Sequence, residues 1–261
     1  MKLSISNIAW QKENDEQMYK IINECGFDAV EVAPTRLIPE SPYDNIGEAK
    51  KIATELVEKY NIKISSMQSI WFGKQEKIFE SEEERNILFE YTKKAIDFAN
   101  AINCGNLVFG CPKNRVVNNL ESDYKIAKDF FMKIGDYAKQ KDTIFAIEPN
   151  PTIYNTNFIN TTEDAINIVK DLNHPSIMVN LDLGTMIQNN ESSDLLKGNV
   201  KYINHVHISE PNLNCIQNRD LHNNVIKILQ DENYKGYVSI EMKSGCSIEQ
   251  IKDKMKYLKN I

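Results

Sequence analysis

TIFAIEPNP, residues 143–151, is an apolar run that ends abruptly in a carboxylate and a proline. Thr143 to Ile147 are apolar or β-branched, which predicts a short buried strand. Glu148 stands at the end of this strand, where a carboxylate is costly unless a charged or hydrogen-bonding partner meets it. The stretch therefore predicts a buried strand that brings Glu148 to a partner elsewhere in the chain.

Apolar runs of the same kind recur along the whole chain, and each is followed by a helical pattern. The eight predicted strands are 2–9, 27–33, 62–69, 106–110, 143–148, 176–182, 202–209 and 237–242. The clearest helix follows the third strand, where Ser81 and Glu84 form a capping-box signature. The helix expected after the sixth strand, at about 191–198, is short and polar, and it is the weakest of the predicted helices.

Strands that alternate with helices, without a Pro-, Gly- or Ser-rich linker, predict a single α/β domain over residues 1–261. The expected architecture is a (β/α)8 TIM barrel with eight parallel strands. A doubly wound open sheet is the alternative, and it would usually place a glycine-rich phosphate loop after the first strand. SNIAWQKEND, residues 6–15, contains no glycine, so we expect the closed barrel.

The composition limits the classes of function. Of the 261 residues, 41% are hydrophobic and 26% are charged, which is typical of a globular protein with a large core. The net charge is −6 and no run of five or more Lys or Arg occurs, so we expect no nucleic-acid surface. No apolar stretch approaches the length of a membrane span. The first residues lack a signal-peptide pattern, and the five cysteines form no CxxC pair, so we expect a reducing cytoplasmic location.

Four metal-capable side chains stand near the carboxyl ends of the last four predicted strands: Glu148, Asp182, His207 and Glu241. In a (β/α)8 barrel, catalytic groups come from this end of the strands. Three carboxylates and one imidazole suit a divalent ion such as Mn, Mg, Co or Zn. Any one of these residues could belong to an ordinary ion pair, but four at equivalent positions are hard to explain separately. We therefore expect one divalent metal ion at this end of the barrel.

The segments AIEPNP (146–151), NLDLGT (180–185), NHVHISEP (204–211) and YVSIEMK (237–243) resemble those of the xylose isomerase-like barrels, the sugar phosphate isomerase/epimerase group. The resemblance covers essentially the full chain, and the order Glu, Asp, His, Glu is its most specific part. It implies that these four residues bind one divalent ion. It further implies that Glu148 and Glu241 are catalytic and move protons on opposite faces of a bound sugar.

The resemblance implies a metal-dependent isomerase or epimerase of a small sugar, sugar phosphate or hydroxy-carbonyl compound, acting through a metal-stabilised enediolate. Its partner would be this small carbohydrate, and relatives commonly pair as homo-oligomers. A keto-polyol (inosose-type) dehydratase and an apurinic-site endonuclease are the alternatives within the group. A sugar-binding barrel without turnover is the non-enzymatic alternative. Many members carry a histidine where this chain has Thr185, and with only four histidines in all the multi-zinc endonuclease is disfavoured.

Further polar residues near these strand ends are candidates for contacts with the substrate. His205 shares the inward face of its strand with His207, and we expect a buried hydrogen-bond donor behind the ligands rather than a fifth ligand. His222 either reaches the substrate or starts a helix, and Lys243 either binds an anionic group or is solvated. Asn114 and Arg115 contact the substrate or stabilise their own loop. The remaining candidates are Gln68, Asn150, Tyr154 and Thr185.

Overall fold

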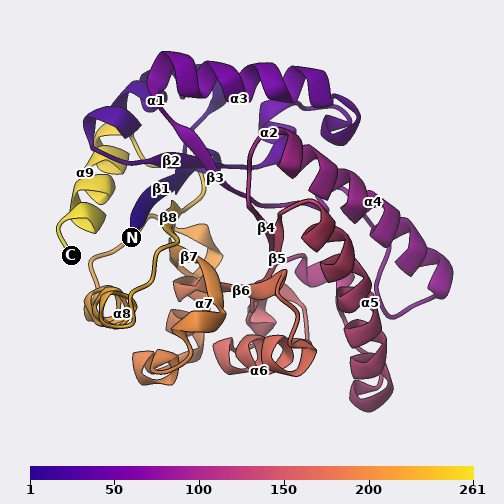
Figure 1. The fold of residues 1–261 in the computed structure, drawn as a ribbon. Helices are drawn as coiled ribbons and strands as arrows, with labels where there is room; N and C mark the ends of the chain where they lie inside the picture. The colour runs from indigo at the N-terminus through magenta and orange to yellow at the C-terminus, as the bar shows by residue number, and fades with distance from the viewer.

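The computed structural model describes all 261 residues, and its eight parallel strands close into a barrel in the order β1 to β8 (Figure 1). The strands are β1 Lys2–Ser6, β2 Ala29–Val32, β3 Lys63–Met67, β4 Asn106–Phe109, β5 Ile144–Ile147, β6 Ile177–Asp182, β7 Ile203–Ser209 and β8 Tyr237–Glu241. Because β8 pairs with β1, no strand edge stays open. The predicted (β/α)8 architecture is confirmed.

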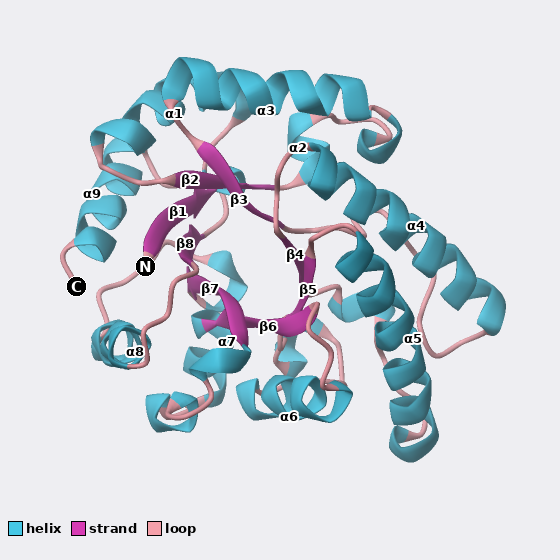
Figure 2. Cartoon of the chain, viewed as in Figure 1, coloured by secondary structure: helices cyan, strands magenta, loops and turns pink.

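Helices surround the strands on all sides of the barrel (Figure 2). They are α1 Asp15–Glu24, α2 Pro34–Leu37, α3 Ile46–Tyr60, α4 Glu82–Ala101, α5 Leu120–Gln140, α6 Thr162–Leu172, α7 Leu183–Asn189, α8 Asp220–Asp231 and α9 Ile248–Lys259. None of them combines the length and the apolar character that a membrane span requires.

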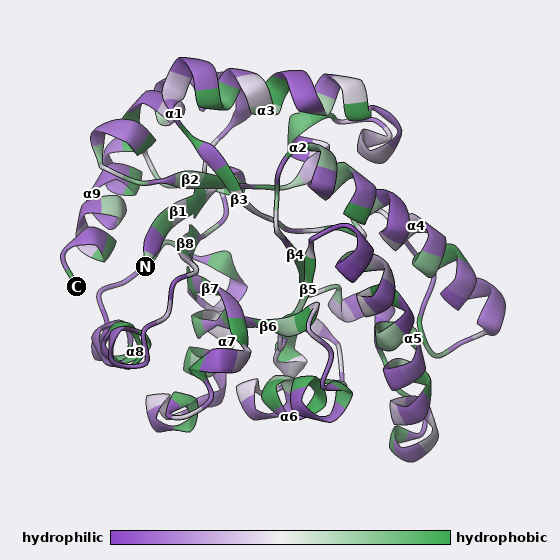
Figure 3. Ribbon diagram, viewed as in Figure 1, coloured by the Kyte–Doolittle hydropathy of each residue, from purple (hydrophilic) through white to green (hydrophobic).

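The apolar residues gather on the strands and on the helix sides that face them, whereas the outer sides of the helices are hydrophilic (Figure 3). The inner strands are buried on both faces, as parallel strands covered by helices must be. For example, Ile5 of β1, Leu107 of β4 and Ile240 of β8 are completely buried. The barrel is therefore a rigid frame that can hold polar side chains at the strand ends.

Two details of the predicted helices differ from the structure. The prediction of a helix at 191–198 is wrong. The helix of this unit is α7, which starts directly after β6 because the Asp182 side chain accepts the N–H of Thr185 and caps the helix. Asn190 ends α7 in the left-handed conformation, and a short 3-10 turn follows at Ser193–Leu196.

The capping box predicted at the start of α4 is only half formed. Ser81 Oγ accepts the N–H of Glu84, as predicted. The Glu84 carboxylate instead accepts the N–H of Lys77 at 2.6 Å, so it fixes the preceding loop rather than the cap residue.

Candidate metal and substrate site

Four acid and imidazole side chains converge at the carboxyl ends of β5 to β8. Glu148, Asp182, His207 and Glu241 each offer one ligand atom, and these atoms all lie within 4.8 Å of one another. His207 Nδ1 lies 3.0 Å from Glu148 Oε1 and 3.2 Å from Glu241 Oε2. The barrel thus brings together the four residues that the sequence predicted as a metal site.

Asp182 is held by hydrogen bonds to both of its carboxylate oxygens. Oδ2 accepts the backbone N–H of Thr185 at 2.8 Å, and its distance to the Thr185 hydroxyl is 2.7 Å. Oδ1 accepts the hydroxyl of Ser209. The Thr185 hydroxyl also lies 2.8 Å from the carbonyl oxygen of Pro149, and its side chain is completely buried. Thr185, predicted to contact the substrate, therefore lies where it orients Asp182.

Glu148 is oriented by amide groups on both sides of its carboxylate. Asn180 Nδ2 donates to Oε1 at 2.7 Å, and Asn150 Nδ2 donates to Oε2 at 3.2 Å. Gly110 lies so close that a Cβ atom at this position would stand 2.6 Å from Glu148 Oε2. A larger residue at this position would therefore force the Glu148 carboxylate to move, because a real Cβ does not approach another heavy atom so closely.

Arg115 is completely buried beneath this end of the barrel. Its Nη2 atom donates to the Glu148 carbonyl oxygen at 2.8 Å and to Asn150 Oδ1 at 2.7 Å. Its guanidinium carbon lies 5.3 Å from the centre of the Phe109 ring. Burial lowers the pKa of Arg115 to about 10, so the group stays charged at neutral pH. Arg115 thus supports the β5 loop from below and does not line the cavity above Glu148.

The other side of the His207 ring faces a second polar layer inside the barrel. His207 Nε2 lies 3.0 Å from Glu31 Oε2, and His205 Nε2 lies 2.7 Å from the same oxygen. Gln68 Nε2 donates to Glu31 Oε1 at 3.1 Å. All four of these side chains are buried. The structure therefore places His205 behind the predicted ligands, in contact with Glu31.

The charges of the cluster do not balance. Burial raises the pKa of Asp182, and the neighbouring Glu148 charge raises it further. Burial also raises the pKa of Glu241. Burial alone would lower the pKa of His207, but the carboxylates of Glu241 and Glu31 outweigh this effect and raise it well above its ordinary value. Four carboxylates around these imidazoles leave an excess of negative charge, and their donor atoms fit a divalent cation.

A cavity of about 210 Å³ opens above the cluster. Its lining residues are Gln68, Ser69, Val108, Gly110, Cys111, Pro112, Glu148, Asn150, Tyr154, Asp182, Leu213 and Glu241. The Tyr154 hydroxyl accepts the N–H of Asn212 at 2.8 Å, which ties the loop after β5 to the loop after β7. Three predicted contact residues, Gln68, Asn150 and Tyr154, are thus brought to this cavity.

Three other predicted contact residues lie away from this cavity. His222 is buried on α8, where its Nδ1 lies 3.2 Å from the Tyr257 hydroxyl, and burial lowers its pKa to about 4. Asn114 donates to the carbonyl oxygens of Lys74 and Glu76, so it stabilises its loop. Lys243 is exposed and does not line the cavity. The backbone N–H of Lys243 donates to the carbonyl oxygen of Leu213.

Three buried residues complete the cluster: the sequence assigned no role to Asn180 and Ser209, and it placed Glu31 only among the polar groups at the rim of the barrel. The alternation of side chains along a strand could have found the first two. Asn180 precedes Asp182 by two positions, and Ser209 follows His207 by two, so each shares the inward face. Glu31 lies on β2, and only the closed barrel brings it beneath His207.

Comparison with known proteins identifies the family. The family model described as xylose isomerase-like TIM barrel matches residues 19–261. No curated protein matches the sequence at a significant level.

Several solved structures share the fold. They include 3-keto-D-glucoside 4-epimerase from E. coli (TM-score 0.80, 21% identity, covering 100% of both chains) and D-psicose 3-epimerase from Clostridium cellulolyticum H10 (TM-score 0.82, 14% identity, covering 100% of this chain and 97% of the other). A third is an AP endonuclease, family 2, from Brucella melitensis (TM-score 0.75, 20% identity, covering 95% of this chain and 96% of the other). At such identities the structural likeness shows the fold alone, whereas the family model covers most of the chain. The chain belongs to the xylose isomerase-like TIM barrel family.

Proposed function

We propose that this protein is a divalent-metal-dependent isomerase or epimerase of a small sugar or hydroxy-carbonyl compound. The observation that carries the proposal is the convergence of Glu148, Asp182, His207 and Glu241 beneath one small cavity. These four residues would hold the metal ion. When bound, the ion would supply positive charge where negative charge develops on the substrate oxygens.

The carboxylates differ in how strongly the protein engages them. Three hydrogen-bond donors lie against the two oxygens of Asp182 (the Thr185 N–H, the Thr185 hydroxyl and the Ser209 hydroxyl), whereas Glu148 has two amide donors, so we assign Asp182 to holding the cation only. Glu241 contacts His207 through Oε2, which leaves Oε1 for a substrate proton. Glu148 also contacts His207 Nδ1, through Oε1, and lines the same cavity. The two glutamates are therefore the candidates for removing a proton beside a carbonyl and for returning it.

Burial supports this role for Glu241. A carboxylate with its ordinary pKa is a weak base at neutral pH, and an acid–base group works best when its pKa lies near the working pH. Burial raises the pKa of Glu241, which brings it closer to neutral pH. Asn180 and Asn150 would fix the Glu148 carboxylate in one orientation while a proton is transferred.

The structural neighbours agree with a sugar substrate, since two of those named above are sugar epimerases. A keto-polyol dehydratase would share the first proton abstraction and then expel hydroxide. One neighbour is an AP endonuclease, so nucleic-acid cleavage is the other alternative function. Two observations count against the endonuclease function. The Thr185 hydroxyl lies within hydrogen-bond distance of Asp182 and of the Pro149 carbonyl oxygen, and His222 lies away from the cavity.

The test is to load the protein with Mn²⁺, Mg²⁺ or Co²⁺ and incubate it with a panel of ketoses and keto-polyols in D₂O. We expect an epimer or aldose–ketose pair by NMR, with deuterium at one carbon that lost its proton. Chelator-treated protein and Asp182→Asn, each lacking a complete metal site, are the controls. A dehydrated product, or cleavage of an abasic-site oligonucleotide that Glu148→Gln abolishes, would contradict the proposal.

A further inference from the structure

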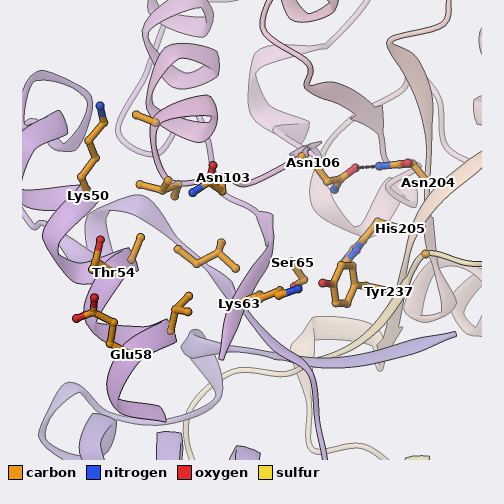
Figure 4. Close-up of a pocket in the computed structure, with 17 residues that line it drawn as sticks. Lys50, Thr54, Glu58, Lys63, Ser65, Asn103, Asn106, Asn204, His205 and Tyr237 are labelled. Carbon is orange, nitrogen blue, oxygen red and sulfur yellow. Dashed lines mark hydrogen bonds between the residues drawn. The ribbon is translucent and has the colours of Figure 1, made fainter. Parts of the chain in front are cut away.

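A second and larger cavity lies at the opposite end of the barrel from the metal cluster. Its volume is about 880 Å³, within the range of small-molecule sites of roughly 300–1,000 Å³. It is lined by the first residues of β3, β4, β7 and β8, and by α3 and the end of α4 (Figure 4). Glu148 and Glu241 stand at the carboxyl ends of their strands, so the two cavities lie at opposite ends of the barrel axis.

The inner part of this amino-terminal cavity carries a mixed set of hydrogen-bonding groups. Figure 4 shows the Tyr237 hydroxyl turned toward Lys63 and Ser65. Asn204 Nδ2 donates to Asn106 Oδ1 at 2.7 Å, which leaves the Asn204 side-chain oxygen as an acceptor. Lys63 and Tyr237 can donate to a ligand, and Asn204 can accept from it. A molecule with hydroxyl groups matches this set because each hydroxyl both donates and accepts.

His205 forms the innermost wall of the amino-terminal cavity. Its Nε2 lies 2.7 Å from Glu31 Oε2, but neither Nε2 nor Nδ1, both of them buried, has a hydrogen-bond partner. Buried polar atoms in folded proteins nearly always have a partner. A hydrogen-bonding group brought to this wall of the cavity would give the His205 ring a partner that it lacks.

The other lining residues of the cavity indicate the polarity and the charge of the ligand. Ala53, Val57 and Ile64 form an apolar side against which the carbon face of a ring can pack. The charged lining residues are Lys50, Lys63 and Glu58. Neutral hydrogen-bonding residues outnumber them, and the single acid and two lysines do not form a dedicated anion site. This balance favours a neutral ligand.

We propose that the amino-terminal cavity binds a small neutral polyhydroxylated molecule of the monosaccharide or cyclitol class. None of its lining residues is one of the four predicted metal ligands, so the inference does not rest on the proposed function. The ligand would lie against His205, one layer below His207 on the same strand.

The experiment records side-chain ¹⁵N NMR spectra of the whole protein labelled at histidine, which gives signals from only four residues. The probes are D-glucose, D-fructose and myo-inositol, each titrated into metal-free protein. We expect a saturable shift of the His205 ring signals with at least one probe. Tyr237→Phe, which removes a hydroxyl from the inner cavity, should weaken this binding several-fold and leave the fold intact.

Two glycines provide a blocking variant and its matched control. A Cβ atom at either Gly105 or Gly47 would meet no other atom within 4 Å, but only Gly105 lines the cavity. Gly105→Leu should therefore place a side chain in the cavity and reduce binding at least tenfold, whereas Gly47→Leu should bind as the unmodified protein does.

Three results would overturn the proposal. The first is the absence of a saturable His205 shift with every probe. The second is binding that survives in Gly105→Leu, which would place the sugar at the other end of the barrel. The third is preferential binding of inorganic phosphate that Lys63→Met abolishes, because it would make the cavity an anion site. None of these results depends on turnover, so each is distinguishable from failure of the proposed catalytic function.

Discussion

His207 Nε2 lies 3.0 Å from Glu31 Oε2, on the side of the imidazole that faces away from the other three predicted metal ligands. The opposite nitrogen, Nδ1, faces Glu148 and Glu241. A carboxylate that accepts the Nε2–H fixes the ring orientation and leaves the Nδ1 lone pair for a cation. Glu31 on β2 therefore decides which face of His207 is presented to the metal site.

Glu31→Gln should weaken metal binding without loss of the fold. Glutamine keeps the size of the side chain but removes the charge that orients His207, and losses of this kind cost roughly 10–100-fold in metal affinity. Calorimetric titration with Mn²⁺ measures the change, and histidine ¹⁵N shifts report the tautomer of His207. Glu83→Gln, at an exposed residue of α4, is the control. Unchanged affinity together with an unchanged tautomer would show that Glu31 has only a packing role.

Metal binding should release a proton, and the metal affinity should rise with pH. The carboxylates of Glu241 and Glu31 raise the pKa of His207 well above its ordinary value, so we expect metal-free His207 to carry a proton on both ring nitrogens at neutral pH. A cation at Nδ1 displaces this proton, and the competition disappears only above the raised pKa. The proton release can be measured from binding enthalpies in buffers of different ionisation enthalpy.

The matched variant for this measurement is Glu31→Gln. Without the Glu31 charge the pKa of His207 should fall, so fewer protons should be released at neutral pH than from the unmodified protein. Equal proton release in both proteins would mean that Glu31 does not control the protonation of His207.

Gly110→Ala should damage the site although it adds a single methyl group. The new Cβ would stand 2.6 Å from Glu148 Oε2 and 3.5 Å from Asn150 Oδ1, so Glu148 must move. Because a misplacement of about 1 Å can cost roughly 100-fold in rate, we expect a loss of this order in turnover. Gly105→Ala, at the other end of β4, meets no atom within 4 Å and should be neutral. Equal activity of the two variants would contradict the assigned position of Glu148.

The sequence predicted the barrel and the convergence of the four acid and imidazole residues because both follow from periodicity. Strands buried on both faces are continuous apolar runs, and parallel strands that close into a barrel bring their carboxyl ends together. The residue at the end of each strand is therefore predictable. Glu148 and Asp182 are examples, since each follows directly from where its apolar run stops.

Contacts through loops were not predictable in the same way. His222 was a candidate for the substrate, but the buried face of α8 turns it toward Tyr257. Arg115 was a candidate for the rim, but its loop folds it beneath the Glu148 backbone. The length of a loop does not fix which way its side chains turn, whereas strand alternation does. The contact of Glu31 with His207 likewise depends on which strands face each other across the barrel.

The last prediction concerns the proton. Glu148 and Glu241 both contact His207 Nδ1, and if they act on opposite faces of the substrate, their loss should have different consequences. Glutamine keeps the size and one oxygen donor at each position but cannot accept a proton. Each single variant should lose roughly 10²–10⁴ in turnover, the usual cost of removing an acid–base group. Excess metal should not restore it, which separates lost basicity from a weakened ligand.

Solvent exchange then assigns each glutamate to one face of the substrate. An epimerase removes the proton from one face and returns one to the other, so a variant that lacks one base cannot complete turnover in either direction. The remaining base can still exchange the substrate proton on its own face with solvent. Each variant is therefore incubated in D₂O with each of the two epimers, and deuterium incorporation is followed by NMR. Glu148→Gln should exchange only one epimer and Glu241→Gln only the other, with the double variant as the inactive control. Near-normal turnover in both metal-loaded single variants would mean that neither glutamate is the base.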